Sequence, residues 1–329
     1  MVRIGVLGAG RIGQVHGASI KALDEATLVA VADAVPAAAE ALAAKTGAEV
    51  RSSDDILTSD DIDAVVIGTP TPTHFDLIHG AARTGKAILC EKPVDMEVER
   101  IRACAAVVAE AGVPFMAGFN RRFDTNFGSL RARIRDGAIG AVELVSITSR
   151  DPAPPPISYI KSSGGIFRDM MIHDFDMARF LIGEEFVRLH AVGSALVDPA
   201  IGAAGDVDTA AVILTTASGR ICQISNSRRA AYGYDQRVEV HGEAGMLRAE
   251  NQLETSVELA TKGGFTRDPA QHFFLERYGV AYVAEMRAFV EAVRNGTAPE
   301  PGIEDGLRAQ MLADAATLSA ESGQPVEVG

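Results

Sequence analysis

A glycine-rich turn near the N-terminus constrains the fold of this chain more than any other feature. The segment VRIGVLGAGRIG, residues 2–13, sets Gly8, Gly10 and Gly13 between an apolar, strand-like run and a helix-length stretch. In such a turn the first glycine permits the tight bend, the second lets backbone approach a pyrophosphate at the helix N-terminus, and the third allows close helix–sheet packing. The segment therefore predicts a strand–turn–helix unit that binds a dinucleotide. The alternative is a glycine turn in an α/β domain that binds none.

The first 120 residues alternate between apolar runs and helix-length stretches. Buried parallel strands are predicted at VRIGVL, ATLVAVAD, DAVVIGT, KAILCE and PFMAGF. The stretches between them include RIGQVHGASIKAL, PAAAEALAAKTG and EVERIRACAAVVAEAG. Strict alternation of strand and helix is typical of a doubly wound sheet. Residues 1–120 are therefore predicted to form a Rossmann domain.

The sequence pattern then changes. A helix over FGSLRARIRDG and a strand over residues 142–150 come first, and short runs of alternating apolar and polar residues follow between about 187 and 259. Such alternation predicts an antiparallel sheet. Two helices, near 275–295 and 303–322, close the chain. We therefore expect a second α/β domain over 121–329, with an open, mostly antiparallel sheet.

Charge and cysteine content argue against several kinds of partner. The 329 residues include 31 Lys and Arg against 44 Asp and Glu, a formal net charge of −13. This balance argues against nucleic acid or an anionic membrane as the main partner. No run approaches the roughly 18 apolar residues of a membrane span, and the three separated cysteines show no metal-ligand spacing. We expect a cytoplasmic protein with reduced thiols and no bound metal.

The second predicted strand ends in an acidic residue. Asp33 follows Gly13 by twenty residues, and a carboxylate at this place can accept hydrogen bonds from both ribose hydroxyls of a dinucleotide. The same carboxylate repels a 2′-phosphate, and its neighbours Ala34 and Val35 offer no cation to bind one. The sequence therefore predicts NAD rather than NADP.

Two further loops follow predicted strands at their carboxyl ends, where the ligands of open sheets bind. GTPTPTH spans Gly68 to His74, and CEKP spans Cys90 to Pro93. The first loop could be only a Pro-rich turn that ends a strand, and Lys92 in the second could be a solvated lysine. A Lys–Pro bond can also be cis, which would fix the loop sharply.

An acid and an imidazole stand four residues apart in the apolar segment GGIFRDMMIHDFDMARF, residues 164–180. Spacing of four places Asp169 and His173 on one face of a predicted helix. Other interpretations stay open, because a histidine on an apolar helix is often a buried structural residue, and Asp169 could be a helix N-terminal acid favoured by the macrodipole. Asp176 is a second candidate partner of His173. Asp174, about 100° around the helix, is expected to be solvated or at an interface.

These motifs, in this order, resemble those of the glucose-fructose oxidoreductase/inositol dehydrogenase (Gfo/Idh/MocA) family. The glycine turn, the TPTH loop and the EKP turn identify the family only. Four stretches resemble its inositol 2-dehydrogenase branch, namely GFNRRFD, SRDPAPPP, GGIFRDMMIHDFDMARF and YGYDQRVEVHG. The resemblance covers essentially the whole chain. It implies a Rossmann domain, a second domain with an open antiparallel sheet, and a homo-oligomer, expected to be a tetramer, formed through that sheet.

The resemblance also implies roles for individual residues. Lys92, Asp169 and His173 would form the catalytic group. NAD is expected to contact residues of the three loops and Asp33, namely Gly8, Gly10, Arg11, Ile12, Gly13, Asp33, Thr69, Pro70, His74, Glu91 and Lys92. A polyol site would be lined by the catalytic group together with Asn120, Arg122, Asp151, Tyr232 and Tyr234. Because residues two apart on a strand share a face, both tyrosines could reach the substrate.

The side chains of the catalytic group suit the oxidation of a secondary alcohol. A base must take the hydroxyl proton, and an imidazole such as that of His173 can do so in its neutral form. Asp169 can accept a hydrogen bond from the other ring nitrogen and stabilise the imidazolium. Lys92 can stabilise the developing alkoxide.

The expected reaction is the NAD-dependent oxidation of myo-inositol to 2-keto-myo-inositol (scyllo-inosose). The resemblance selects the 2-position, and a ring with a hydroxyl on every carbon can engage many polar groups, whereas a 2-hydroxy acid cannot. A dehydrogenase for scyllo-inositol or another sugar or polyol is the alternative. A non-catalytic sugar or nucleotide sensor would keep the glycine turn but would have no need of Lys92, Asp169 and His173 together.

Overall fold

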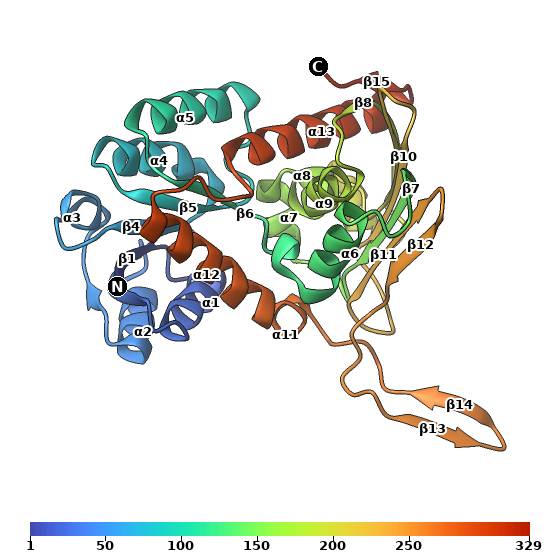
Figure 1. Cartoon of the computed structure of the whole chain (residues 1–329), viewed down its shortest axis with the longest axis horizontal. Coiled ribbons are helices and arrows are strands. Elements are labelled where there is room, and N and C mark those ends of the chain that lie inside the picture. The colour runs from blue at the N-terminus through green and yellow to red at the C-terminus, as the bar shows by residue number, and fades with distance from the viewer. The chain divides into compact units, whose positions relative to one another are not determined.

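The computed structural model describes all 329 residues, which divide into two compact units. Unit 1 comprises Met1–Phe123 and Gly279–Gln310, and unit 2 comprises Asp124–Tyr278 and Met311–Gly329. Figure 1 traces the chain through both. The predicted domain boundary at residue 120 lies three residues before the end of the first segment of unit 1. Residues 279–310 were predicted to belong to the second domain, whereas the structure places them in unit 1.

Unit 1 is built on a six-stranded parallel sheet with the strand order β3-β2-β1-β4-β5-β6 (Figure 1). This order confirms the predicted doubly wound sheet. Strand β3 was not predicted, because its two exposed residues carry no apolar pattern. The strands are β1 Val2–Leu7, β2 Ala26–Ala32, β3 Glu49–Val50, β4 Ala64–Ile67, β5 Ala87–Glu91 and β6 Phe115–Gly118.

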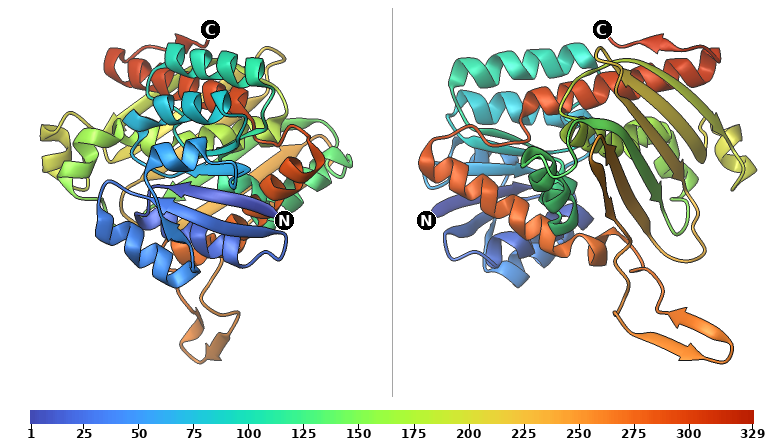
Figure 2. Two further views of the ribbon diagram at one scale, coloured as in Figure 1. Left: turned by 90° about the vertical axis from the view of Figure 1, so that its left-hand side faces the viewer. Right: turned by 45° about the vertical axis from the view of Figure 1, so that its right-hand side comes forward.

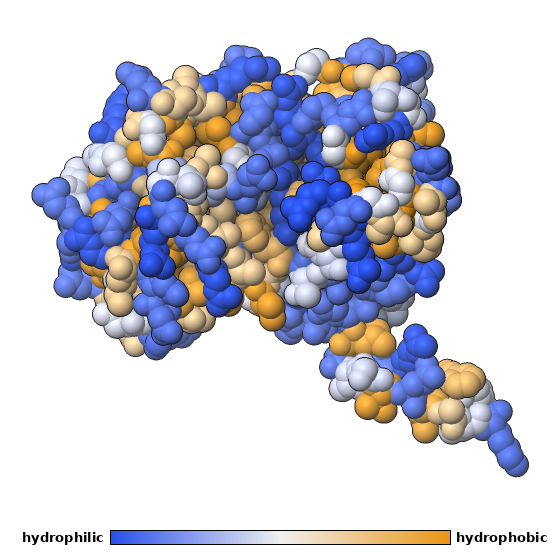
Figure 3. Space-filling model, in the orientation of Figure 1, coloured by the Kyte–Doolittle hydropathy of each residue, from blue (hydrophilic) through white to orange (hydrophobic).

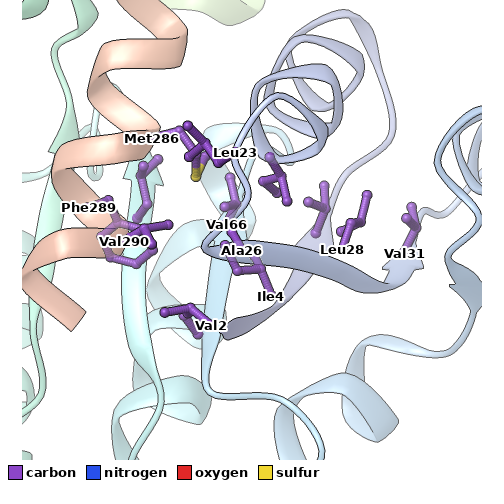
Figure 4. Close-up of a cluster of buried hydrophobic side chains, with 14 of the residues drawn as sticks. Val2, Ile4, Leu23, Ala26, Leu28, Val31, Val66, Met286, Phe289 and Val290 are labelled. Carbon is purple, nitrogen blue, oxygen red and sulfur yellow. The ribbon is translucent and has the colours of Figure 1, made fainter. Parts of the chain in front are cut away.

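The helices of unit 1 include one that comes from near the C-terminus. Met286, Phe289 and Val290 of α12 are buried in the same core cluster as Val2 and Ile4 of β1 (Figure 4). This apolar face explains why residues after 278 return to unit 1. The helices are α1 Arg11–Lys21, α2 Pro36–Thr46, α3 Ser53–Thr58, α4 His74–Arg83, α5 Val98–Ala111 and α12 Gly279–Asn295, with single 3₁₀ turns η1 Thr71–Thr73 and η2 Asn120–Phe123.

Unit 2 contains a seven-stranded sheet with the order β12-β11-β7-β10-β9-β8-β15. Its neighbouring strands are antiparallel except for β7 and β10, which run parallel, with Arg150 opposite Ser227. The prediction of a mostly antiparallel sheet is confirmed, and the parallel pair brings the ends of β7 and β10 to one edge. The strands are β7 Val142–Arg150, β8 Phe186–Ser194, β9 Thr209–Thr216, β10 Ile221–Ser227, β11 Asp235–Gly242, β12 Gly245–Ala249 and β15 Val326–Glu327.

Helices cover one face of this second sheet (Figure 2). Residues of β9 alternate between buried and exposed, and α9 packs against β7 and β10, so the opposite face of the sheet is open. The helices of unit 2 are α6 Thr125–Arg135, α7 Ile157–Ser163, α8 Gly165–Asp169, α9 Ile172–Ile182, α10 Pro199–Ala203 and α11 Phe274–Arg277, and α13 Ile303–Ser322 begins in unit 1 and ends in unit 2. No helix of the chain is both long enough and apolar enough to cross a bilayer.

A separate hairpin extends from the rest of unit 2 (Figure 1). Its strands, β13 Glu258–Thr261 and β14 Gly264–Arg267, consist entirely of exposed residues. Apolar and polar residues are mixed along it (Figure 3), and the exposed fraction is 77% for Phe265.

Candidate active site

Of the three glycines of the turn, only Gly10 has room for a side chain in the structure. Gly8 has a positive φ of 98°, and a Cβ there would lie 2.6 Å from the carbonyl carbon of Gly68. A Cβ on Gly13 would lie 1.9 Å from the carbonyl oxygen of Gly8, whereas a Cβ on Gly10 would meet no atom within 4 Å. Gly10 is also the N-cap of α1, whose first turn holds no acidic residue. This open, electropositive helix start fits the pyrophosphate of a dinucleotide.

The carboxylate of Asp33 is held by the glycine turn. Its Oδ2 accepts the N–H of Ala9 at 2.6 Å, and its Oδ1 accepts the N–H of Val35 at 2.7 Å. An ionised carboxylate has about four acceptor sites, so two backbone donors leave capacity for ribose hydroxyls. The position and orientation of Asp33 therefore fit the predicted ribose contact.

A buried histidine joins the two loops that follow β4 and β5. The Nε2 atom of His74 lies 2.9 Å from the carbonyl oxygen of Thr69, and Nδ1 lies 3.0 Å from that of Pro93. Burial lowers the pKa of His74 below its ordinary value, so the ring is neutral at neutral pH. A neutral imidazole carries one N–H, so His74 donates to only one of these two oxygens while it packs between the TPTH loop and the EKP turn.

The EKP turn carries two predicted site residues, one buried and one partly exposed. Glu91 is the last residue of β5, and its Oε1 lies 2.7 Å from Nε2 of His16 on α1. Lys92 follows and is half-buried, and its peptide bond to Pro93 is cis. Glu91 was predicted to contact NAD, and its contact with His16 was not predicted.

Two predicted substrate residues belong to η2, directly after β6. Asn120 is buried, with 3% of its surface exposed. The guanidinium of Arg122 forms an ion pair with Asp305, with 2.8 Å between Nη2 and Oδ1. If Arg122 binds substrate, it must do so while its guanidinium remains paired with the carboxylate of Asp305.

Asp169 and His173 were predicted to lie on one continuous helix, but the structure divides them between two helices. Helix α8 ends at Asp169, and α9 begins at Ile172. The N–H groups of Met170 and Met171 both donate to the carbonyl oxygen of Ile166, at 3.0 and 2.9 Å. This shared acceptor interrupts the regular i to i−4 ladder, so the helical-spacing argument does not apply across the break.

Asp169 is contacted on both carboxyl oxygens by side chains that the sequence analysis missed. Oδ1 accepts a hydrogen bond from Tyr159 Oη at 2.8 Å, and Oδ2 lies 3.3 Å from Nη1 of Arg228. Arg228 directly follows β10, outside every motif noted in the sequence, and only 1% of its side chain is exposed. Nothing in the sequence marks it except its place at the end of a strand.

The two other aspartates of the segment are buried. Asp174 is 0% exposed and accepts hydrogen bonds from Ser149 Oγ and Asn226 Nδ2, both at 2.7 Å. The expectation that Asp174 is solvated or interfacial is therefore wrong, because it attaches α9 to polar side chains of β7 and β10. Asp176 is 1% exposed and lies 4.0 Å from Arg179 Nη1.

The remaining predicted substrate residues flank the edge where β7 and β10 end. Asp151 follows β7, and its N–H donates to the carbonyl oxygen of Ser227 at 2.9 Å. Tyr232 is 49% exposed, whereas Tyr234 is 5% exposed. The two rings do not share a strand face as expected, because β11 begins only at Asp235 and Gly233 between them has a φ of 110°.

The predicted cofactor residues all lie in unit 1, whereas the predicted catalytic and substrate residues are found in both units. The cofactor residues and Lys92 lie in unit 1, at the carboxyl ends of the parallel strands and in the turns that follow them. Asp169, His173, Asp151 and both tyrosines lie in unit 2. In unit 1 the predicted residues offer open backbone at Gly10 and the carboxylate of Asp33, and in unit 2 they include an imidazole and two carboxylates.

Comparisons with known proteins identify relatives of this chain. An inositol 2-dehydrogenase of Rhizobium meliloti (strain 1021) is 57% identical over 327 residues, which cover 99% of each chain. The structure of a myo-inositol dehydrogenase from Corynebacterium glutamicum ATCC 13032 is similar with a TM-score of 0.96 and 44% identity, covering 100% of this chain and 99% of that one. A scyllo-inositol dehydrogenase from Lactobacillus casei, with NAD(H) and scyllo-inositol bound, gives 0.94 and 32%, covering 100% and 99%.

Two family models match the chain in sequence order. The GFO/IDH/MocA model, an oxidoreductase family with an NAD-binding Rossmann fold, matches residues 2–119, and the model of the GFO/IDH/MocA C-terminal domain matches residues 127–248. The relatives extend the match over almost the whole chain. The chain therefore belongs to the GFO/IDH/MocA family of NAD-dependent oxidoreductases.

Proposed function

We propose that this chain oxidises myo-inositol to 2-keto-myo-inositol. The observation that carries the proposal is 57% identity, over 99% of both chains, to an inositol 2-dehydrogenase. Bound NAD would supply the hydride acceptor for this reaction. The backbone of the glycine turn and Asp33 would hold the pyrophosphate and the ribose, because the open backbone at Gly10 and the oriented carboxylate fit those groups.

His173 is the proposed base for the substrate hydroxyl. It stands at the start of α9 and is partly exposed, so a substrate can reach its ring. Asp169 is the proposed electrostatic partner of the imidazolium that forms when the proton arrives. Lys92 is proposed to donate to the substrate oxygen and to stabilise the developing alkoxide charge.

The other groups are proposed to read the hydroxyls of the ring. A site built from hydrogen-bonding side chains rejects analogues that lack the matching hydroxyl, because its buried polar groups would be left unpaired. Deoxy-inositols should therefore be poor substrates. The proposed lining residues are Asn120, Arg122, Asp151, Tyr232 and Tyr234.

A product analysis tests the proposal. The protein is supplied with NAD and with either myo-inositol or scyllo-inositol, reduced nicotinamide is followed by absorbance, and the ketone is identified by NMR. We expect turnover of myo-inositol with 2-keto-myo-inositol as the product. Turnover of scyllo-inositol with none of myo-inositol would favour the second candidate, which the similarity to the scyllo-inositol dehydrogenase supports at 32% identity. NAD binding without turnover of any polyol would favour a sensor.

We further propose that copies of this chain form a homotetramer through the open face of the unit 2 sheet. Apolar side chains stand exposed on that face, including Val192, Ile213, Ile221 and Met246, with exposed fractions of 41–56%. Ile213→Glu should therefore dissociate the assembly, as measured by analytical ultracentrifugation. A wild-type monomer would contradict the proposal.

The three cysteines are buried free thiols, which suits the cytoplasmic location that we also propose.

A further inference from the structure

A mostly buried acid, Asp206, holds the start of the short helix that ends in Asp169. Gly164 and Gly165 both have positive φ angles, and the Oδ1 of Asp206 accepts the N–H of Ile166 at 3.0 Å. A Cβ on Gly165 would lie 2.8 Å from the same oxygen. The two glycines therefore bring the first turn of α8 against Asp206, which lies in the loop between α10 and β9.

A buried arginine connects this acid to the other end of the helix. The N–H of Arg228 donates to the carbonyl oxygen of Asp208 at 2.8 Å, which fixes its backbone beside the Asp206 loop. Its Nη2 lies 3.6 Å from Asp206 Oδ2, and its Nη1 lies 3.3 Å from Asp169 Oδ2. The side chains of Arg228, Asp206 and Asp169 are 1%, 11% and 13% exposed. One permanently charged guanidinium thus stands between two carboxylates at opposite ends of a five-residue helix.

We propose that Arg228 is the positioning residue of Asp169 and acts on the reaction only through it. The inference rests on the proposed function, in which Asp169 stabilises the imidazolium of His173. With Tyr159 on Oδ1 and Arg228 on Oδ2, both oxygens of Asp169 are held in place. Without the guanidinium, two poorly solvated carboxylates would face the same space, and their repulsion would move the carboxylate of Asp169.

The first test compares adjacent arginines. Arg228→Gln should lower kcat by about 10–100-fold, since a misplacement of about 1 Å costs rates of that order, with NAD affinity unchanged because the cofactor residues lie in unit 1. Arg229→Gln is the matched control, because Arg229 is exposed and directly follows in the sequence. Arg228→Lys keeps the charge but not the forked geometry, so it should recover part of the lost kcat. Equal kcat for the two glutamine variants would overturn the proposal.

The second test separates positioning from general structural support. Arg228→Gln is combined with Asp169→Asn, and kcat is measured for the four combinations. A residue that acts through Asp169 has little left to affect in Asp169→Asn, so the second substitution should cost less than twofold there. The same fold-loss in both backgrounds would overturn the proposal. If Arg228→Gln does not fold, Arg228→Lys takes its place in the cycle.

A stability cycle keeps this inference separate from the proposed function. If the wild-type protein turns over no polyol, the proposed function fails, but the contact between Arg228 and Asp169 can still be tested by thermal unfolding. The Tm losses of Arg228→Gln and Asp169→Asn should then be non-additive, because each removes the same charged interaction. Additive losses would overturn the positioning role as well.

Discussion

The imidazole of His16 and the carboxylate of Glu91 form a buried contact, with 2.7 Å between Nε2 and Oε1. It connects α1, which begins at the glycine turn, to the end of β5, which Lys92 follows. Glu285 of α12 completes a buried acidic group around this contact. It is 0% exposed, and neither of its carboxyl oxygens has a hydrogen-bond partner. Burial, and secondarily the charge of Glu91, raise the pKa of Glu285 well above its ordinary value.

Glu285→Gln should therefore stabilise the protein increasingly as pH rises. The folded state keeps the proton of Glu285, whereas the unfolded state releases it above the ordinary pKa of a glutamate. Between those two pKa values the folded state binds more protons, so the free energy of unfolding of the wild type falls as pH rises. Glutamine has nearly the same shape and no proton to lose. Its Tm advantage should be small near pH 4.5 and should grow toward pH 8, as thermal unfolding can measure.

The control for that experiment is Glu291→Gln on the exposed side of the same helix. It removes the same negative charge from α12 without touching the buried group. The other ionisable groups of elements that contact α12 are unchanged in both variants, including His16 and the buried Arg121 of η2. A pH-independent difference between wild type and Glu285→Gln would show that Glu285 is ionised in the folded protein at neutral pH.

Alanine at Gly10 and at Gly13 should have opposite consequences. A methyl group on Gly13 collides with the carbonyl oxygen of Gly8, so the turn must shift and Tm should fall. A methyl group on Gly10 meets no protein atom, so Tm should be unchanged while NAD affinity falls, because the methyl group occupies space that a pyrophosphate needs. Calorimetric titration of NAD and thermal unfolding of both variants would check this. Unchanged NAD affinity in Gly10→Ala would contradict the assignment of the open space to the cofactor.

The sequence predicted those features that repeat or that use local geometry. Alternation of apolar runs and helices was sufficient for the parallel sheet of unit 1, since buried strands on both faces of such a sheet must be apolar throughout. The glycine turn and Asp33 could be placed because their spacing follows from one strand–turn–helix unit. The path of α12 back to unit 1 was not predictable in this way, because its apolar face does not reveal which sheet it covers.

The candidate site shows the same limit at the level of single residues. Helical spacing was assumed from Asp169 to His173, but the carbonyl oxygen of Ile166 accepts two N–H groups and the helix breaks. Arg228 contacts Asp169 from 59 residues away in sequence. Such a partner depends on where the end of β10 meets α8, which no local pattern encodes. Polar residues that are fixed by distant strands are therefore the ones that sequence reasoning missed.

Asp33→Ala should weaken the preference for NAD without creating a good NADP site. The carboxylate accepts the N–H groups of Ala9 and Val35 and would also accept the ribose hydroxyls. Hydrogen bonds to a charged group contribute about 1.5–3 kcal/mol each, so kcat/KM with NAD should fall by roughly 10–100-fold. Activity with NADP should rise less, because removal of a repelling charge supplies no cation for the phosphate. A wild type that used NADP as well as NAD would contradict the role of Asp33.

His173→Ala should lose turnover far more than cofactor affinity. A group that transfers a proton in the transition state contributes about 10²–10⁴-fold to the rate, and the predicted cofactor residues lie in the other unit. His272→Ala is a suitable control, because His272 is an exposed histidine in the same unit and lies outside the seven-stranded sheet. Asp169→Asn and Lys92→Ala should each lower kcat too, and double variants should be non-additive, since groups that act on one proton transfer fail together. Alcohol oxidation by the wild type should also accelerate as pH rises, because the reaction releases a proton and requires a neutral imidazole. Near-normal kcat of His173→Ala at neutral pH would mean that another group takes the proton.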